Sequence, residues 1–128
     1  MRQMFSEIKN KWYLEKLNLI TNTVDKINPS CVLLCYNADV DGLIAAVFIS
    51  KFLKYMNSRA NIIEKPVFNF QYDFSWLNSV QQQVNPDAII CVDLPIIQET
   101  DIVNRVSKKS ALIIYDHHLV LNLSLIHI

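Results

Sequence analysis

Two carboxylates stand close together directly after one of the most apolar stretches of the chain. The run CVLLC (31–35) is followed by Asn37, Asp39, Asp41 and Gly42, and this glycine is the only one in the sequence. Two neighbouring carboxylates at the end of a buried element repel each other and resist the loss of their water shell. A cation held between Asp39 and Asp41 would relieve both costs.

Two further groups of ligand-type side chains follow apolar runs later in the chain. Asp93 follows one run, and the triplet Asp116, His117 and His118 follows another. Carboxylates combined with imidazoles suit a divalent cation of intermediate hardness, for which Mn²⁺ is the best match and Mg²⁺ or Zn²⁺ is less well matched. The number of these ligands exceeds the needs of one catalytic ion. Two ions about 3.5–4 Å apart, which share a bridging carboxylate and activate a water, fit better.

Each of these groups also has a purely structural explanation. Asp39 and Asp41 could be an N-cap and a turn residue before a helix, and Asp93 could be an ordinary turn residue. The histidine pair could be a partly exposed loop feature. All three explanations must hold at once for the chain to lack a site, so the coincidence favours a shared function.

The elements that must position these groups alternate between helices and strands. Apolar residues at helical spacing predict an amphipathic helix over 3–27 and further helices over 43–56, from Asp73 or Ser75 to Val84, and over 98–109. Short apolar runs predict strands at 31–36, within 61–70, at 87–94 and at 111–115. Pro66 should place the second strand at or near a sheet edge.

This alternation favours parallel strands joined by right-handed crossovers. We therefore expect an α/β fold with an open, doubly wound, mostly parallel sheet of four or five strands and helices on both faces. Ligands bind beyond the carboxyl ends of the strands in such sheets, so the three groups should meet at one edge. We divide the chain into an amphipathic helix (1–28), the α/β domain (29–118) and a tail (119–128).

Gly42 and the helix that follows it have a place in this scheme. A glycine lets the backbone turn tightly at the strand end and approach a ligand closely. The helix points its N-terminal N–H groups at the same edge, which favours an anionic substrate. We expect Gly42 to contribute to substrate binding.

Composition limits the partners. The 128 residues are 52% apolar and 19% charged, which is typical of a single globular domain, and no apolar run approaches the roughly 20 residues needed to span a bilayer. Twelve basic residues balance twelve acidic ones, so the composition does not predict strong non-specific binding to nucleic acid. A small phosphorylated ligand is still compatible. The three cysteines lack C-x-x-C spacing and lie in predicted strands, which indicates buried free thiols in a reducing cytoplasm: Cys31, Cys35 and Cys91.

Three segments of the chain resemble a known superfamily. NADVDGLIAA, VDLP and YDHH are similar, in order and spacing, to the first three motifs of the DHH phosphoesterases, and the resemblance spans residues 31–118. This superfamily includes RecJ-like exonucleases, oligoribonucleases, cyclic-dinucleotide phosphodiesterases and manganese pyrophosphatases. The resemblance implies that Asp39 and Asp41 bind separate Mn²⁺ ions, that Asp93 bridges the two ions, and that His117 is a ligand of the second ion.

The resemblance also assigns the rest of the triplet. Asp116 would orient and brace the imidazoles, and His118 would lie nearer the substrate, where it contacts the phosphoryl group or assists proton transfer. Members often carry His or Asp at the place of Asn37, whose amide oxygen is a neutral and weaker metal ligand. The superfamily also has a later Asp motif and a C-terminal substrate-binding domain. The chain stops ten residues after His118, so we expect an N-terminal fragment with a truncated or artefactual tail, weak or inactive alone.

The expected function is metal-dependent hydrolysis of phosphodiester bonds in short single-stranded nucleic acids or nucleotides. Four aromatic residues near the same edge could stack bases, with core packing as the alternative: Tyr36, Phe70, Tyr72 and Tyr115. A second hypothesis is a DHH-fold binding or regulatory module that has lost turnover, to which Asn37 lends support. A third is a flavodoxin-like receiver domain with one Mg²⁺, which leaves the DHH triplet unused.

Overall fold

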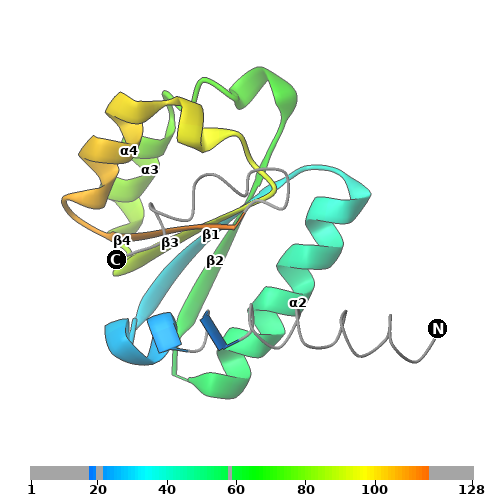
Figure 1. Cartoon of the computed structure of the whole chain (residues 1–128), viewed down its shortest axis with the longest axis vertical. Coiled ribbons are helices and arrows are strands. Elements are labelled where there is room, and N and C mark those ends of the chain that lie inside the picture. The colour runs from blue at the N-terminus through cyan, green and yellow to red at the C-terminus, as the bar shows by residue number, and fades with distance from the viewer. Residues whose placement is uncertain (1–17, 20–21, 58, 116–128) are drawn as a thin grey trace, which may run out of the picture.

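The computed structural model describes residues 18–19, 22–57 and 59–115. Residues 22–27 are helical, and the following elements are β1 (Cys31–Asn37), α2 (Val40–Met56), β2 (Asn61–Val67), the short 3₁₀ helix η1 (Asn69–Gln71), α3 (Leu77–Val84), β3 (Ala88–Val92), the 3₁₀ helix η2 (Ile96–Gln98), α4 (Thr100–Ser107) and β4 (Ala111–Tyr115) (Figure 1). Most of the helix expected over 3–27 lies outside the described residues. No helix of the described part is long and apolar enough to cross a membrane.

The four strands form one sheet in the order β2-β1-β3-β4, and every pairing is parallel. The predicted α/β fold with a parallel sheet is therefore confirmed. Pro66 lies on the edge strand β2, where its missing N–H removes no bond from the interior of the sheet. After β1, the chain forms β2 on one side of β1 and then forms β3 on the other side of β1. The point between β1 and β3 is thus the place where the strand order reverses.

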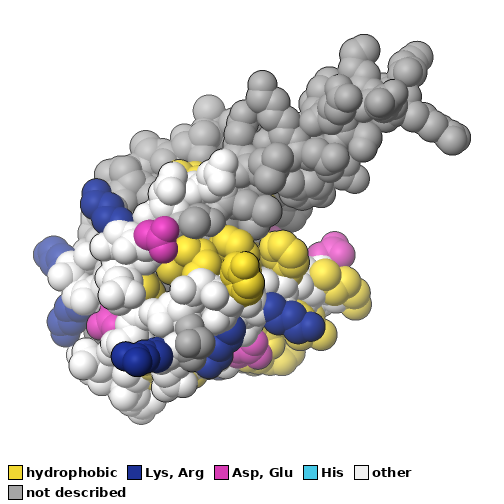
Figure 2. Space-filling view, turned by 90° about the horizontal axis from the view of Figure 1, so that it is seen from below, with side chains coloured by type: hydrophobic (Ala, Val, Ile, Leu, Met, Phe, Trp, Pro, Cys, Tyr) yellow, Lys and Arg dark blue, Asp and Glu magenta, His cyan; other side chains and the backbone are white. Residues whose placement is uncertain are grey.

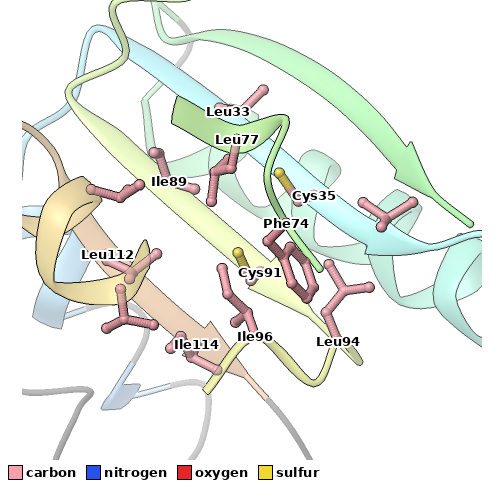
Figure 3. Close-up of a cluster of buried hydrophobic side chains, with 13 residues drawn as sticks. Leu33, Cys35, Phe74, Leu77, Ile89, Cys91, Leu94, Ile96, Leu112 and Ile114 are labelled. Carbon is pink, nitrogen blue, oxygen red and sulfur yellow. The ribbon is translucent and has the colours of Figure 1, made fainter. Parts of the chain in front are cut away.

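Helices cover both faces of the sheet, as predicted (Figure 1). Successive side chains of β1 point to opposite faces: Leu34 packs with Ile49 and Leu53 of α2, whereas Leu33 packs with side chains of α3 and α4. Figure 3 shows the second of these clusters, in which Phe74 points inward next to Leu94. Both halves of the core thus depend on the alternation along the central strands.

The three cysteines are free thiols, as the sequence indicates, but Cys31 is only half-buried and not buried as expected. Cys35 of β1 and Cys91 of β3 are buried and lie opposite each other in the sheet. The hydrogen bond between the two side chains, together with burial, raises the pKa of Cys91 well above its ordinary value. These thiols are therefore inert core residues rather than nucleophiles.

Helix α2 is apolar on both of its faces. Ala46, Ile49 and Leu53 are buried against the sheet, whereas on the opposite side the helix exposes Val40, Leu43, Ile44, Val47, Phe48 and Tyr55. In Figure 2, hydrophobic side chains gather on the right-hand side of the molecule, the side on which α2 lies in Figure 1. Lys51 and Lys54 are exposed, as expected.

Helix boundaries are where the sequence predictions fail. Helix α2 starts at Val40 rather than Leu43 because Asp39 caps it. Helix α3 starts at Leu77, and neither Asp73 nor Ser75 is its N-cap. Asp73 instead accepts hydrogen bonds from the backbone N–H and the hydroxyl of Ser75, at 3.4 and 3.1 Å, in a local turn. This turn competes with helix formation and delays the start of α3.

Candidate functional site

The ends of β1 and β3 meet where the strand order reverses. Asn37 is the last residue of β1 and Asp39 follows it, while Asp93 follows β3. Backbone hydrogen bonds continue just past both strands: the N–H of Ala38 donates to the carbonyl of Val67 at 2.8 Å, and that of Asp93 to the carbonyl of Tyr115 at 3.0 Å. In open α/β sheets, ligands bind in the crevice at this position.

Asp39 is the N-cap of α2. Its backbone is extended, and its Oδ1 accepts a hydrogen bond from the backbone N–H of Gly42 at 2.7 Å. The structural explanation for Asp39 is therefore correct as far as capping goes. Capping engages one oxygen, and the other, Oδ2, accepts a hydrogen bond from the side-chain amide of Asn37 at 2.9 Å. These two hydrogen bonds fix the orientation of an exposed carboxylate at the positive end of a helix.

Gly42 is buried in the first turn of α2. A Cβ at this position would lie 2.8 Å from the carbonyl carbon of Asn37 and 3.1 Å from its Cβ. The backbone of Gly42 is not in the left-handed region, so the glycine is required by close packing of the helix on the strand end and not by a turn. Asn37 fills the space that a Cβ would take, which accounts for the glycine, and the expected close approach to a ligand is not tested by this packing. Substrate binding by Gly42 stays a prediction.

A chain of hydrogen bonds joins Tyr72 to Asp39 through Asn37. The Tyr72 hydroxyl donates to Oδ1 of Asn37 at 2.6 Å, and Nδ2 of Asn37 donates to Asp39. An amide suits this position because it accepts from the phenol with one end and donates to the carboxylate with the other. An aspartate at position 37 could accept the hydrogen bond from the phenol, but it could not donate to Asp39 and its charge would repel that carboxylate. The prediction that Asn37 is a metal ligand is not tested by these contacts.

Tyr72 also connects the two strand ends electrostatically. Burial raises the pKa of its hydroxyl, the negative charges of Asp39 and Asp93 raise it further, and the hydrogen bond to Asn37 acts in the opposite direction. One phenol therefore feels carboxylates from both β1 and β3. The sequence placed Tyr72 at this edge as a base-stacking candidate, and its hydrogen bond to Asn37 was not predicted. The alternation of buried and exposed residues after β2 carries no signal for such a contact.

Asp93 adopts a backbone conformation that is uncommon for its residue type. Its φ is 56°, in the left-handed region, and its side chain is half-buried. Only Gly, and to a lesser extent Asn and Asp, occupy this region without substantial strain. Residues held in such conformations cluster at functional sites. This conformation is compatible both with a turn residue and with a functional residue, so the role of Asp93 stays a prediction.

The other predicted site residues are placed less closely or not at all. Asp41 lies in the first turn of α2 and is exposed. Asp116, His117 and His118 lie outside the described residues, and the described ranges alone contain no group of three His, Cys, Asp or Glu residues that could hold a metal ion. Asp39 and Asp93 both lie near enough to Tyr72 for their charges to raise its pKa, and carboxylate oxygens are ligands that a hard divalent cation prefers.

The four aromatic residues expected at this edge differ in exposure. Tyr36 is 8% exposed and packs in the core on the α2 side, so the core-packing explanation holds for it. Phe70 is 82% exposed. Tyr72 and Tyr115 are half-buried.

Comparison with known proteins gives one match. Residues 30–126 match the model of a family described as the DHH family, N-terminal domain. No curated protein and no solved structure matches the chain.

Proposed function

The chain belongs to the DHH family, and on that premise we propose that it hydrolyses phosphodiester bonds of short nucleic acids or nucleotides. The family lies within a superfamily of metal-dependent phosphoesterases. One observation supports the proposal above the others. Asp39 and Asp93 follow two adjacent strands, β1 and β3, at the point where the strand order reverses. The negative charges of both carboxylates raise the pKa of the Tyr72 hydroxyl.

The proposed cofactor is a pair of Mn²⁺ ions, with Mg²⁺ as the alternative. Their proposed ligands are Asp39, Asp41, Asp93 and His117, with Asn37 as a weaker oxygen donor. Such ions, when bound, supply positive charge that lowers the pKa of a water and stabilises charge on the phosphoryl oxygens. The donor set of the described residues fits this role because carboxylate oxygens are the ligands that Mn²⁺ and Mg²⁺ prefer.

The chain's own groups have separate tasks in this proposal. Two hydrogen bonds hold the carboxylate of Asp39 in one orientation. Tyr72 fixes Asn37 and thereby keeps the Asn37 amide directed at Asp39. The N-terminus of α2 lies at the carboxyl end of β1, and the positive end of the helix would favour a phosphate there. Asp116 would brace the imidazoles, and His118 would contact the phosphoryl group or move a proton.

Metal counting on variants tests the site. We expect Asp93→Asn to lose both Mn²⁺ ions after equilibrium dialysis, because a bridging ligand serves both, whereas His117→Ala should lose chiefly one. Asp101→Asn, which removes an exposed carboxylate in the first turn of α4, is the matched control and should keep both ions. Elemental analysis gives the stoichiometry, and hydrolysis of a dinucleotide should fall with it. Equal and independent losses in the two variants would remove the bridging role, and a wild type that binds no Mn²⁺ would contradict the proposal.

A second candidate is a binding or regulatory module without turnover, and one observation favours it. The amide oxygen of Asn37 already accepts the Tyr72 hydroxyl, which weakens it as a metal ligand. Asn37→His should then tighten Mn²⁺ binding, since imidazole is the stronger ligand, and in a complete protein it should raise hydrolysis at limiting Mn²⁺. Unchanged Mn²⁺ affinity would mean that side chain 37 does not face the ions. Membership of the DHH family excludes the receiver-domain alternative.

The proposed partners follow from the same chemistry. They are a phosphorylated small molecule or a short single-stranded nucleic acid, together with a C-terminal substrate-binding domain of the kind this superfamily carries. The buried thiols of Cys35 and Cys91 support a reducing compartment, and we propose the cytoplasm.

A further inference from the structure

Two phenyl rings stand in solvent directly after the edge strand β2. Phe68 is 49% exposed and Phe70 is 82% exposed. Their rings are nearly parallel, with an interplanar angle of 9° and centroids 5.9 Å apart. Burial of one phenylalanine side chain contributes roughly 1.5–3 kcal/mol, and this pair forgoes most of it. We call Phe68 and Phe70 the aromatic platform.

The loop that carries the platform is held by specific contacts. The side-chain oxygen of Gln71 accepts the N–H of Phe68 at 3.1 Å, and the N–H of Gln71 donates to the carbonyl of Phe68 at 2.8 Å. The indole N–H of Trp76 donates to the carbonyl of Gln71 at 2.9 Å. Phe74, 1% exposed, anchors the loop in the core. The exposure of the two rings is therefore a feature of an ordered loop.

The same loop joins the platform to the candidate site. Phe68 follows Val67, whose carbonyl accepts the N–H of Ala38 next to Asp39. Tyr72, two residues beyond Phe70, donates its hydroxyl to Asn37. Two residues span at most about 7 Å of chain, so the exposed ring and the site lie at one edge of the sheet. Figure 1 shows this loop at the same end of the sheet as the start of α2.

We propose that the aromatic platform stacks one base of the nucleotide whose phosphate binds at Asp39 and Asp93. This inference rests on the proposed function for the position of the phosphate. A base inserted between two parallel rings would need a spacing of roughly 7 Å, twice the about 3.4 Å rise of stacked bases. The observed 5.9 Å is smaller, so the base lies on the outer face of Phe70 and Phe68 supports that ring from behind. Aromatic faces accept any base, so the site selects for a base and not for its sequence.

Binding of two dinucleotides with a hydrolysis-resistant phosphorothioate linkage, measured with Mn²⁺ present, tests the platform without hydrolysis. One carries 2-aminopurine, whose fluorescence is quenched by stacking, and the other has the same phosphate and sugars but no bases and is measured by calorimetry. Phe70→Ala should weaken the base-bearing ligand roughly 5- to 100-fold and leave the abasic one unchanged. Phe68→Ala should have a smaller effect, and Phe70→Trp should retain binding. Tyr55→Ala removes an equally exposed aromatic, 89% exposed on α2, and is the matched control.

The possible results distinguish a failure of the platform proposal from a failure of the proposed phosphoesterase function. An unchanged affinity for the base-bearing ligand in Phe70→Ala, or an equal loss for both ligands, overturns the platform. A change in self-association with unchanged ligand affinity would assign the rings to a protein contact and also overturns it. If the wild type prefers the base-bearing ligand through Phe70 yet binds no Mn²⁺ in equilibrium dialysis, the proposed function fails and the platform stands.

Discussion

Helix propensity and close packing predict opposite effects of the substitution Gly42→Ala on stability. In an ordinary helix interior, glycine is about 0.5–1 kcal/mol less favourable than alanine, so Gly42→Ala would stabilise. Here the added Cβ would lie 2.8 Å from the carbonyl carbon of Asn37, and the helix would have to move away from the strand end. We expect Gly42→Ala to lower the free energy of unfolding by about 1–3 kcal/mol, the range typical of overpacking.

Urea unfolding of Gly42→Ala beside Ala45→Gly measures this effect. The control exchanges the same two residue types on the same helix and should show the ordinary propensity cost alone. A stabilised Gly42→Ala variant would mean that α2 does not press on Asn37.

Two substitutions of Asp93 distinguish the energetic cost of its backbone conformation from the role of its carboxylate. Its left-handed backbone, with φ at 56°, costs an L-residue with a Cβ roughly 1–2 kcal/mol, whereas glycine adopts it freely. We expect Asp93→Gly to be about 0.5–1 kcal/mol more stable to urea than Asp93→Ala, because the greater entropy of an unfolded glycine offsets part of the relief. Both variants lose the carboxylate, so neither should bind Mn²⁺. Equal stabilities would show that residue 93 is not held in the left-handed region.

At the scale of elements, Asp87 ties the start of β3 to the start of β1. Its Oδ2 accepts hydrogen bonds from the N–H and hydroxyl of Ser30, at 2.7 and 2.6 Å, and from the N–H of Cys31 at 3.2 Å. These bonds, led by the Ser30 hydroxyl, hold the pKa of Asp87 below its ordinary value. Because Asp87 is exposed, we expect Asp87→Asn to cost only about 1 kcal/mol at pH 7.

The pH dependence of this contribution has a definite sign. The unfolded chain protonates Asp87 at a higher pH than the folded chain does, so the unfolded state binds more protons in the interval between the two pKa values, and stability rises with pH there. The contribution is present above about pH 4 and is lost as pH falls through the folded pKa. Urea unfolding from pH 7 to pH 2 should show wild type and Asp87→Asn converging at low pH. A gap that stays constant would mean that the carboxylate charge does not matter.

The strands and helices show which features of the fold could be predicted from the sequence. The strands stand out because continuous apolar runs of this length are typical of a parallel sheet, and β4 has the predicted bounds at Ala111–Tyr115. Helix ends are less predictable, since they depend on which polar side chain finds a backbone N–H: Asp39 does, whereas Asp73 bonds to Ser75 instead. The carboxylates of the site were predicted from their place after strands. Tyr72 was not predicted as a partner of Asn37 because contacts across 35 residues leave no local pattern.

At the scale of the whole molecule, the candidate site joins the two halves of the sheet. Asp39 belongs to the half in which β1 pairs with β2, and Asp93 to the half in which β3 pairs with β4. An ion that needs both carboxylates can bind tightly only when β1 and β3 are paired. Metal binding should therefore stabilise the fold as one unit, because a ligand that binds only the folded state shifts the folding equilibrium.

We expect Mn²⁺ at a hundredfold excess over its Kd to raise the free energy of unfolding by about 2.7 kcal/mol for each ion bound. Urea unfolding with Mn²⁺ and with EDTA measures the difference. Asp93→Asn should abolish most of it, since Asp93 serves both ions, and Asp39→Asn should abolish about half, since Asp39 serves one, whereas Asp101→Asn, on the surface of α4, should keep all of it. If the Asp93→Asn variant is stabilised by Mn²⁺ as strongly as the wild type, the ions bind without β3, and the site does not span the point where the strand order reverses.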